Sequence, residues 1–284
     1  MLKKAYEKIN SFWKIYNKNK VAVGGLMIVY FFIILALSAP IISPYDPFKI
    51  NLADRHKPPS REHLMGTDEF GRDVFSRIIW GSRISMIIGF LAAGISTILG
   101  IGLGSISGYY GGMIDDIIMR IVDIFMVIPT FFLILIIIAL FGSSMWNVMV
   151  VIGITSWPGT ARIMRAQFLA VREKEFIEAA KALGANDFKI ILFHILPNAI
   201  YPVVVNASLQ IAGAILTEAS LSFLGLGDPS KISWGLMLNR ALQYMRQSWW
   251  QTIFPGICIF LLVFSFNVIG DGLNDALNPR LRER

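Results

Sequence analysis

The sequence predicts an all-α membrane protein with several spans, and its composition and long apolar stretches are the observations that predict it. Of the 284 residues, 55% are apolar and only 16% are charged, whereas about a quarter of an ordinary soluble domain is charged. A helix needs about 20 apolar residues to cross the hydrocarbon core of a bilayer. Six stretches approach that length, so we expect six transmembrane helices. They cover residues 21–42, 84–108, 117–141, 145–160, 199–224 and 252–270.

The N-terminal part of the sequence predicts one anchor and one long loop. The arm 1–20 is rich in lysine and is too long a charged lead for a typical signal peptide, so the span 21–42 is interpreted as an uncleaved anchor. The loop 43–83 follows, and its last part, Arg72 to Arg83, is amphipathic and suits a helix lying in the membrane interface. The remaining spans form a core over 84–270, and 271–284 is a short tail.

The distribution of Lys and Arg predicts the orientation, because basic residues gather on the cytoplasmic side of a membrane. With six spans the arm 1–20, the polar segment 158–198 and the tail 271–284 share one side, and they carry most of the 26 Lys and Arg residues. The loop 43–83 is also basic, but acidic residues accompany its charges. We therefore expect a multi-pass membrane protein with both termini in the cytoplasm.

Several classes of function find no support in the sequence. The net charge of +7 follows from topology and needs only acidic lipid headgroups as a partner, since no basic patch interleaved with aromatic residues indicates nucleic acid. The single Cys and three scattered His offer neither an intrachain disulfide nor metal-ligand spacing. No GxxxxGK[ST] phosphate loop occurs, so ATP hydrolysis would require a partner. We expect no catalytic residue, metal or bound cofactor on this chain.

The second predicted span, 84–108, carries a small residue at every fourth position along one face. Such a face lets helices approach closely in a membrane, so it predicts a packing seam, within the chain or against a sister subunit, rather than a substrate site. The seam consists of Ala92, Ser96, Gly100, Gly104 and Gly108.

The fifth span, 199–224, carries a polar stripe and is the better candidate for a translocation pathway. Polar side chains are costly against lipid, so they usually face other helices or a wet cavity. Hydrogen bonding between helices explains the stripe equally well. Glu218 lies off this stripe, and we expect it, like Asp123 in the third span, to pair with a buried basic or polar group. The stripe consists of Asn206, Gln210, Gly213, Thr217 and Ser220.

The segment 158–198 is too polar for lipid, so it should project from the membrane and offer itself to a soluble partner. Its periodicity predicts helices over 159–172 and 173–183, which Gly184 ends in the left-handed conformation. Asn186 or Asp187 can then cap a second helix over 188–196, which Pro197 terminates.

The helix before Gly184 has the features of a docking helix. On it, Phe176, Ala179, Ala180 and Leu183 form an apolar stripe with a small pair at its centre, which lets another surface approach the backbone. Glu178 and Lys181 offer charges that can fix the register of a partner. A short helix presented in this way is suited to a groove.

This segment resembles the EAA loop of ATP-binding-cassette (ABC) importer permeases, whose pattern is EAA, three residues, Gly, nine residues, Ile, one residue and Leu-Pro. His194 stands where the pattern has Ile. The resemblance implies that the segment couples the permease to its ATPase subunits. The coupling residues would be Glu178, Ala179, Ala180, Lys181, Leu183, Gly184, Leu196 and Pro197.

Three further stretches narrow the resemblance to the second, C-type permease of dipeptide, oligopeptide and nickel importers. They are GTDEFGRDVFSRIIWGSRIS (66–85), EASLSFLGLG (218–227) and GDGLNDALNPR (270–280). The resemblance implies a type I importer fold, a sister permease, two ATPase subunits that bind ATP and Mg, and an extracytoplasmic solute-binding protein. The loop 228–250, with its tryptophans and arginines, would then receive the binding protein.

The cargo remains open among dipeptides, oligopeptides, nickel chelates and glutathione. Dipeptides or oligopeptides rank first because they are the commonest use of the pattern, and the fifth-span stripe offers nickel neither Cys nor His. Two other classes compete with the importer. An ion-coupled secondary transporter would require coupling-ion sites and repeated broken helices, which the sequence does not indicate. A membrane scaffold or receptor would not need the docking helix.

Overall fold

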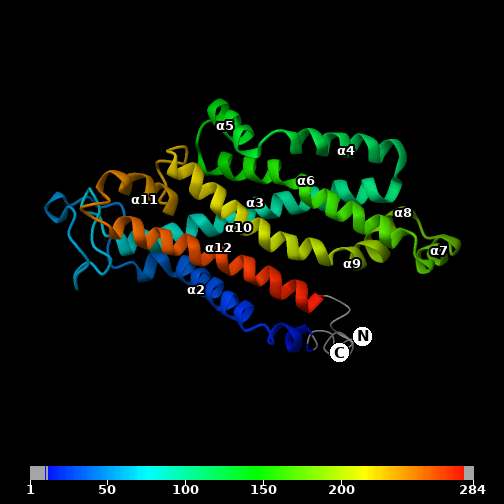
Figure 1. Cartoon of the computed structure of the whole chain (residues 1–284), viewed down its shortest axis with the longest axis horizontal. Helices are drawn as coiled ribbons and strands as arrows, with labels where there is room; N and C mark the ends of the chain where they lie inside the picture. Colours follow the sequence, from blue (N-terminus) through cyan, green and yellow to red (C-terminus); the bar gives the residue numbers. More distant parts are fainter. Residues whose placement is uncertain (1–9, 11, 278–284) are drawn as a thin grey trace.

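The computed structural model describes residue 10 and residues 12–277, and the whole of this part is helices joined by turns and loops, without a strand. The all-α prediction is therefore confirmed. Figure 1 shows an elongated bundle with its long helices nearly side by side, α11 near one end and α7 at the other. Residues 1–9 of the expected arm and 278–284 of the expected tail lie outside the described residues.

Four helices of the described part are long and apolar enough to cross a membrane. They are α2 (Lys20–Ile42), α3 (Val74–Tyr110), α10 (Tyr201–Phe223) and α12 (Trp250–Leu277). A fifth span exists if the bent pair α4 (Gly112–Val127) and α5 (Thr130–Phe141) crosses as one unit. The count of six is thus not reached. α6 (Met145–Arg172) contains the predicted span 145–160, but polar residues and arginines follow its first three turns.

The predicted third span, 117–141, is broken rather than continuous. α4 and α5 meet at an angle of 86°. The break falls at Ile128, which is extended (φ −79°, ψ 121°) and precedes Pro129. A proline disfavours the helical conformation of the residue before it, because its ring collides with that residue's backbone. Pro129 is therefore the sequence signal for this break, but it lies within an apolar run that was interpreted as one continuous span.

The stretch from Arg72 to Arg83 is not a separate interfacial helix. α3 begins at Val74, where the carboxylate of Asp73 accepts a hydrogen bond from the backbone N–H of Ser76, and it continues without a break to Tyr110. Its first turns are buried in protein, since Ile78 and Ile79 are 3% and 0% exposed. The apolar side chains that predicted contact with lipid contact other helices instead.

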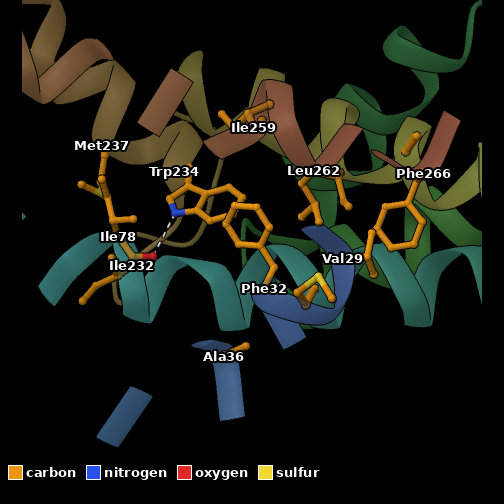
Figure 2. Close-up of a cluster of buried hydrophobic side chains, with 14 of the residues drawn as sticks. Val29, Phe32, Ala36, Ile78, Ile232, Trp234, Met237, Ile259, Leu262 and Phe266 are labelled. Atoms are coloured by element: carbon orange, nitrogen blue, oxygen red, sulfur yellow. Dashed lines mark hydrogen bonds between the residues drawn. The ribbon is translucent and has the colours of Figure 1, made fainter. Parts of the chain in front are cut away.

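The core beside these turns joins four elements that are distant in sequence. Figure 2 shows Trp234 of α11 (Trp234–Ala241) between Phe32 of α2, Ile78 of α3 and Leu262 of α12. The indole Nε1–H of Trp234 donates to the carbonyl of Ile78 at 3.1 Å. Because the only polar atom of the tryptophan is satisfied, the ring can be fully buried.

The two ends of the bundle differ. At one end lies a cap, residues 43–73 and 225–249, which contains α11 and the short helices η1 (Leu52–Asp54) and η3 (Leu242–Tyr244). At the other end lies the projecting part of the segment 158–198, which we call the EAA loop after the pattern it resembles. It contains α7 (Glu175–Ala182), α8 (Asp187–Lys189), the π-helix η2 (Ile190–Ile195) and α9 (Leu196–Ala199).

Two expected boundaries move. Residues 158–172 of the EAA loop do not project, since they continue α6 through the buried Pro158, and Ala161, Met164 and Phe168 are fully buried in the bundle. At the C-terminus, α12 continues to Leu277, so residues 271–277 of the expected tail belong to the last helix.

Candidate functional site

The turn after α7 has the geometry that its glycine predicts. Gly184 has φ +79°, in the left-handed region. Its N–H donates to the carbonyl of Lys181 at 2.9 Å, and the N–H of Ala185 donates to the carbonyl of Ala180 at 3.1 Å. This pair of bonds is the Schellman motif, which satisfies the last carbonyls of a helix and reverses the chain. No atom lies within 4 Å of the position a Cβ would take, so the requirement for glycine comes from the backbone alone.

The second helix of the EAA loop begins as predicted but does not end at Pro197. The side chain of Asn186 accepts a hydrogen bond from the N–H of Lys189 at 2.9 Å and caps α8. The chain then passes through η2 into α9, in which Pro197 occupies the first turn. A proline is tolerated there because the first N–H groups of a helix have no partner within the helix.

The face of α7 that anchors it differs from the predicted apolar stripe. Ile177 and Ala180 are buried, and Ile177 packs in a cluster with Phe168 and Ile190, whereas Ala179 is exposed. Sequence reasoning missed Ile177 as the anchor because the stripe was drawn through its neighbours. Glu178 and Lys181 are exposed beside the small pair, while Leu196 is half-buried and Pro197 exposed.

Four large apolar side chains stand in the open on the EAA loop. Three of them, Phe176, Phe188 and Phe193, were not among the predicted coupling residues, although Phe176 lay on the predicted apolar stripe. Groups of exposed apolar side chains mark interaction surfaces on soluble parts of proteins. We call this group the apolar face. It consists of Phe176 (43% exposed), Leu183 (88%), Phe188 (69%) and Phe193 (68%).

Polar contacts fasten the EAA loop to the end of α3. The guanidinium of Arg172 donates to the carbonyls of Tyr109 and Gly108, at 2.9 and 3.3 Å. The hydroxyl of Tyr109 donates to the carboxylate of Asp187 at 2.5 Å. The last turn of α3 is therefore hydrogen-bonded both to the end of α6 and to the start of α8.

Two ion pairs connect α4 to α6. Arg165 donates to both carboxylate oxygens of Asp115, from Nε at 2.6 Å and from Nη2 at 2.5 Å. Asp123 pairs with Arg162 at 2.5 Å, but both side chains are about half exposed, so the expectation of a buried partner for Asp123 is wrong. α4 thus follows α6 through charges as well as through packing.

The predicted seam lies between α3 and α6. A Cβ on Gly100 would lie 2.4 Å from Cβ of Thr160, and one on Gly104 would lie 2.5 Å from the carbonyl oxygen of Ala161. A Cβ on Gly108 would lie 2.8 Å from the carbonyl oxygen of Arg165. Ala92 and Ser96, nearer the cap, line a cavity instead.

The predicted polar stripe of α10 divides into two parts. Asn206 and Gln210 both donate to the hydroxyl oxygen of Thr160 on α6, at 3.1 and 2.6 Å. Gln210, Gly213 and Thr217 also line a cavity of about 300 Å³ between α3, α6 and α10. The hydroxyls of Thr217 and Ser220 donate to carbonyls of their own helix. The stripe is therefore partly helix-to-helix bonding and partly cavity wall.

The cavity offers polar atoms without a charge. The side-chain oxygen of Gln210 and the hydroxyl of Ser96 are buried and have no hydrogen-bond partner within the described residues. Its walls hold alanines, an isoleucine and Ser156, and no charged side chain lines it. Such a surface can accept an amide group more readily than an ion.

The cap is built on buried charges. Arg72 donates to Asp68 at 2.6 Å and to Glu69 at 3.2 Å, and Arg77 donates to the carbonyl of Pro47 at 2.9 Å. All four charged side chains are less than 9% exposed. Buried charges persist where they are paired and hydrogen-bonded.

Histidines and tryptophans complete the cap. Nδ1 of His63 lies 2.9 Å from the carboxylate of Asp73, and Nδ1 of His56 lies 2.8 Å from the hydroxyl of Ser248. Burial, and then the charge of Arg55, lower the pKa of His56. Within the loop 228–250, Trp234 and Trp250 are buried, whereas Trp249 is 52% exposed. Part of the predicted docking loop is thus core.

Glu218, near the cap end of α10, is also buried, and its carboxylate accepts a hydrogen bond from the hydroxyl of Ser222 at 2.6 Å. Its polar partner was expected. Among the described residues, no group of His, Cys, Asp and Glu is arranged to hold a metal ion.

Comparison with known proteins gives two family matches. The family described as "Binding-protein-dependent transport system inner membrane component" matches residues 100–283. The N-terminal transmembrane domain of oligopeptide transport permease C matches residues 9–59.

Curated relatives match along nearly the whole chain. A dipeptide transport system permease protein of Alkalihalophilus pseudofirmus is 43% identical over 94% of this chain and 88% of its own length. An oligopeptide transport system permease protein of Bacillus subtilis is 40% identical over 99% and 93%. A glutathione transport system permease protein of Pectobacterium atrosepticum is 42% identical over 95% and 91%.

Solved structures share the fold at lower identity. The inward-facing MetNI methionine ABC transporter matches with a TM-score of 0.57 and 19% identity, covering 71% of this chain and 97% of the other.

Proposed function

The chain belongs to the family of binding-protein-dependent transport system inner membrane components, and from this premise we propose that it carries short peptides across the membrane as one subunit of an ABC importer. Membership confirms the resemblance that the EAA pattern indicates. It also makes the chain a membrane permease subunit rather than an enzyme. ATP and Mg would be bound by separate ATPase subunits.

The proposed cargo is a dipeptide or an oligopeptide. Relatives named for dipeptide and oligopeptide transport support this, and the glutathione permease supports the alternative of a modified tripeptide. All these molecules contain amide groups. The uncharged cavity beside α10, with the free oxygen atoms of Gln210 and Ser96, suits amides. The proposed pathway passes along Asn206, Gln210, Gly213, Thr217 and Ser220.

The apolar face and the neighbouring charges of α7 are the proposed docking site for the ATPase subunits. This is the observation that carries the proposal, because Leu183 and Phe188 expose most of their side chains on a segment too polar to lie in lipid. Burying a large apolar side chain is worth roughly 1.5–3 kcal/mol. Glu178 and Lys181 would set the register of the partner, and the glycine turn at Gly184 would hold α7 at its angle.

The contacts of the EAA loop suggest how its movement reaches the bundle. A pull on α7 would reach α3 through the segments on either side of α7, because Arg172 of α6 and Asp187 of α8 both bond to Tyr109. The seam of glycines between α3 and α6 then makes these helices move as one body. Rigid-body rocking of this kind is an established way to open a site to one side and close it to the other.

The remaining partners follow from the proposed orientation. The EAA loop and both termini would face the cytoplasm of a bacterial cell, so the cap would face outward and receive a solute-binding protein. A sister permease would complete the pathway, and membrane lipid would surround the assembly. No nucleic acid is expected.

Reconstitution tests the proposal. We expect a peptide to enter vesicles that contain the chain with its sister permease and ATPases, when ATP is inside with the EAA loops and the binding protein is outside. Vesicles without ATP should show only leakage. Uptake by the chain alone, driven by an ion gradient, would favour the secondary transporter and contradict the proposal.

A further inference from the structure

A second cavity, of about 400 Å³, lies where the cap meets the bundle. Ile84 and Ile87 of α3 form its wall on one side, and Trp146 at the start of α6 forms another. The cap contributes Phe48 and Ile232. Its lining is therefore mainly apolar and aromatic, and it is separate from the cavity beside α10.

Two cations border this apolar space. Arg83 lies with its guanidinium carbon 5.1 Å from the centre of the Trp80 ring, and Lys231 extends from the cap. Neither forms an ion pair within the described part of the chain. The nearby acid, Asp228, is engaged as an acceptor by the N–H of Met145 and by Ser230. Two positive charges thus border the cavity, and no acidic side chain of the described residues lines it.

Trp80, which lines the cavity, carries an unpaired donor. Nε1 of Trp80 is buried and has no hydrogen-bond partner among the described residues. An indole N–H of this kind usually finds an acceptor when it is buried. A ligand with oxygen atoms beside Arg83 could supply that acceptor.

The depth of the cavity points to a lipid. Arg83 is the last charged residue before a run without charge from Ile84 to Ile114, so it marks the boundary of the hydrocarbon core along α3. Trp80 and Trp146 stand near that boundary, where tryptophan gathers in membrane proteins. Charged groups therefore lie at headgroup level, and the apolar wall lies beside them.

We propose that this cavity binds an anionic phospholipid of the leaflet on the cap side. Its phosphate lies between Arg83 and Lys231 and accepts from the Trp80 indole, while an acyl chain covers Ile84 and Ile87. The lipid joins α3, α6 and the cap. This inference needs neither the cargo nor the ATPases, so it stands apart from the proposed function.

Native mass spectrometry tests the proposal on the complete complex, purified with its sister permease and ATPases and mixed with equal amounts of phosphatidylglycerol and phosphatidylethanolamine. We expect phosphatidylglycerol to be retained. The double variant Arg83→Gln/Lys231→Gln should retain about 25-fold less, since each basic residue near an anionic surface contributes about a factor of five. The control Arg61→Gln/Arg246→Gln removes two exposed cap cations away from the cavity and should retain the lipid fully.

A milder variant keeps the test decisive if the double variant does not assemble. Trp80→Phe preserves an aromatic ring and removes only the N–H, and it should weaken retention by several-fold. Equal retention of the two lipids by the wild-type complex would overturn the proposal. The same result is expected if the sister permease, rather than a lipid, fills the cavity. Equal retention of phosphatidylglycerol by the wild type and the cavity variants would overturn it as well.

Discussion

The cap and the EAA loop satisfy their side chains in opposite ways. The cap buries charges, and Arg72, Asp68 and Glu69 find their partners within the same chain. The EAA loop exposes apolar groups, and Leu183 and Phe188 stand almost free. A buried charge without a partner is costly, and an exposed group of apolar side chains indicates a surface that a partner covers. The cap therefore satisfies its buried charges within the chain, although it too exposes apolar side chains such as Leu52 and Trp249. The apolar face of the EAA loop is covered only in an assembly.

The first prediction breaks the assembly without disturbing the fold. Leu183→Asp combined with Phe188→Asp should abolish co-purification of the ATPases and reduce peptide uptake by about 100-fold or more, because two apolar contacts of roughly 1.5–3 kcal/mol each are lost and charges are buried in their place. The melting temperature of the isolated chain should not change, since both side chains are exposed. A large fall in melting temperature would show that this face belongs to the fold.

The second prediction breaks the cap without touching the loop. Arg72→Met leaves the buried Glu69 without its cation and leaves Asp68 with only Arg77, at 3.5 Å, so we expect it to destabilise the chain by about 3–5 kcal/mol. Thermal unfolding in detergent measures the loss. Binding of the ATPases to the protein that remains folded should be unchanged.

The pair Arg162–Asp123 provides the control for that variant, because its side chains are 48% and 60% exposed. Arg162→Met should cost less than about 1 kcal/mol, as exposed ion pairs do. Equal losses for the two variants would contradict the idea that burial makes the cap depend on its charges.

The third prediction concerns the backbone that positions the apolar face. Gly184→Val forces a β-branched residue into φ +79° and should cost about 1–2 kcal/mol locally. We expect uptake to fall several-fold while the ATPases hydrolyse ATP without transport. Gly159→Ala is the control, since Gly159 is helical and nothing lies within 4 Å of its added Cβ. Unchanged uptake per ATP in Gly184→Val would show that the angle of α7 does not matter.

The fourth prediction is the smallest and concerns the pH response of the cap. Because the pKa of His56 is lowered in the folded chain, the unfolded chain binds more protons below its pKa of about 6.5. Stability should therefore fall as the pH drops below about 6.5, and it should level off below the folded pKa. His56→Gln should reduce the slope of the melting temperature plotted against pH in this range. A curve equally steep in the variant would assign the response to other groups.

The turns and helix caps of the EAA loop were predictable from sequence, whereas the contacts of the cap were not. The turn at Gly184 and the cap at Asn186 depend on local rules, and both are present. The pairing of Arg72 with Asp68, or of His56 with Ser248, depends on how loops far apart in sequence meet. No periodicity reports such contacts.

Prolines explain most of the errors in the helices. Pro158 begins the segment that was expected to project from the membrane, and Pro197 was expected to end a helix. The first is instead buried in a continuous α6, and the second lies in the first turn of α9. Pro129, which passed unnoticed in an apolar run, is the one that bends the chain. The effect of a proline depends on whether neighbouring helices hold the chain in place, which the sequence alone does not state.

Site-specific crosslinking compares the two ends in one experiment and tests the central claim most directly. A photo-crosslinking amino acid is placed either at Leu183 of the EAA loop or at Leu52 of the cap, two leucines that are 88% and 67% exposed. In the assembled complex we predict a crosslinked product with the mass of the chain plus one ATPase from position 183, and none from position 52. Absence of that product at position 183, or the same product from both positions, would contradict the account.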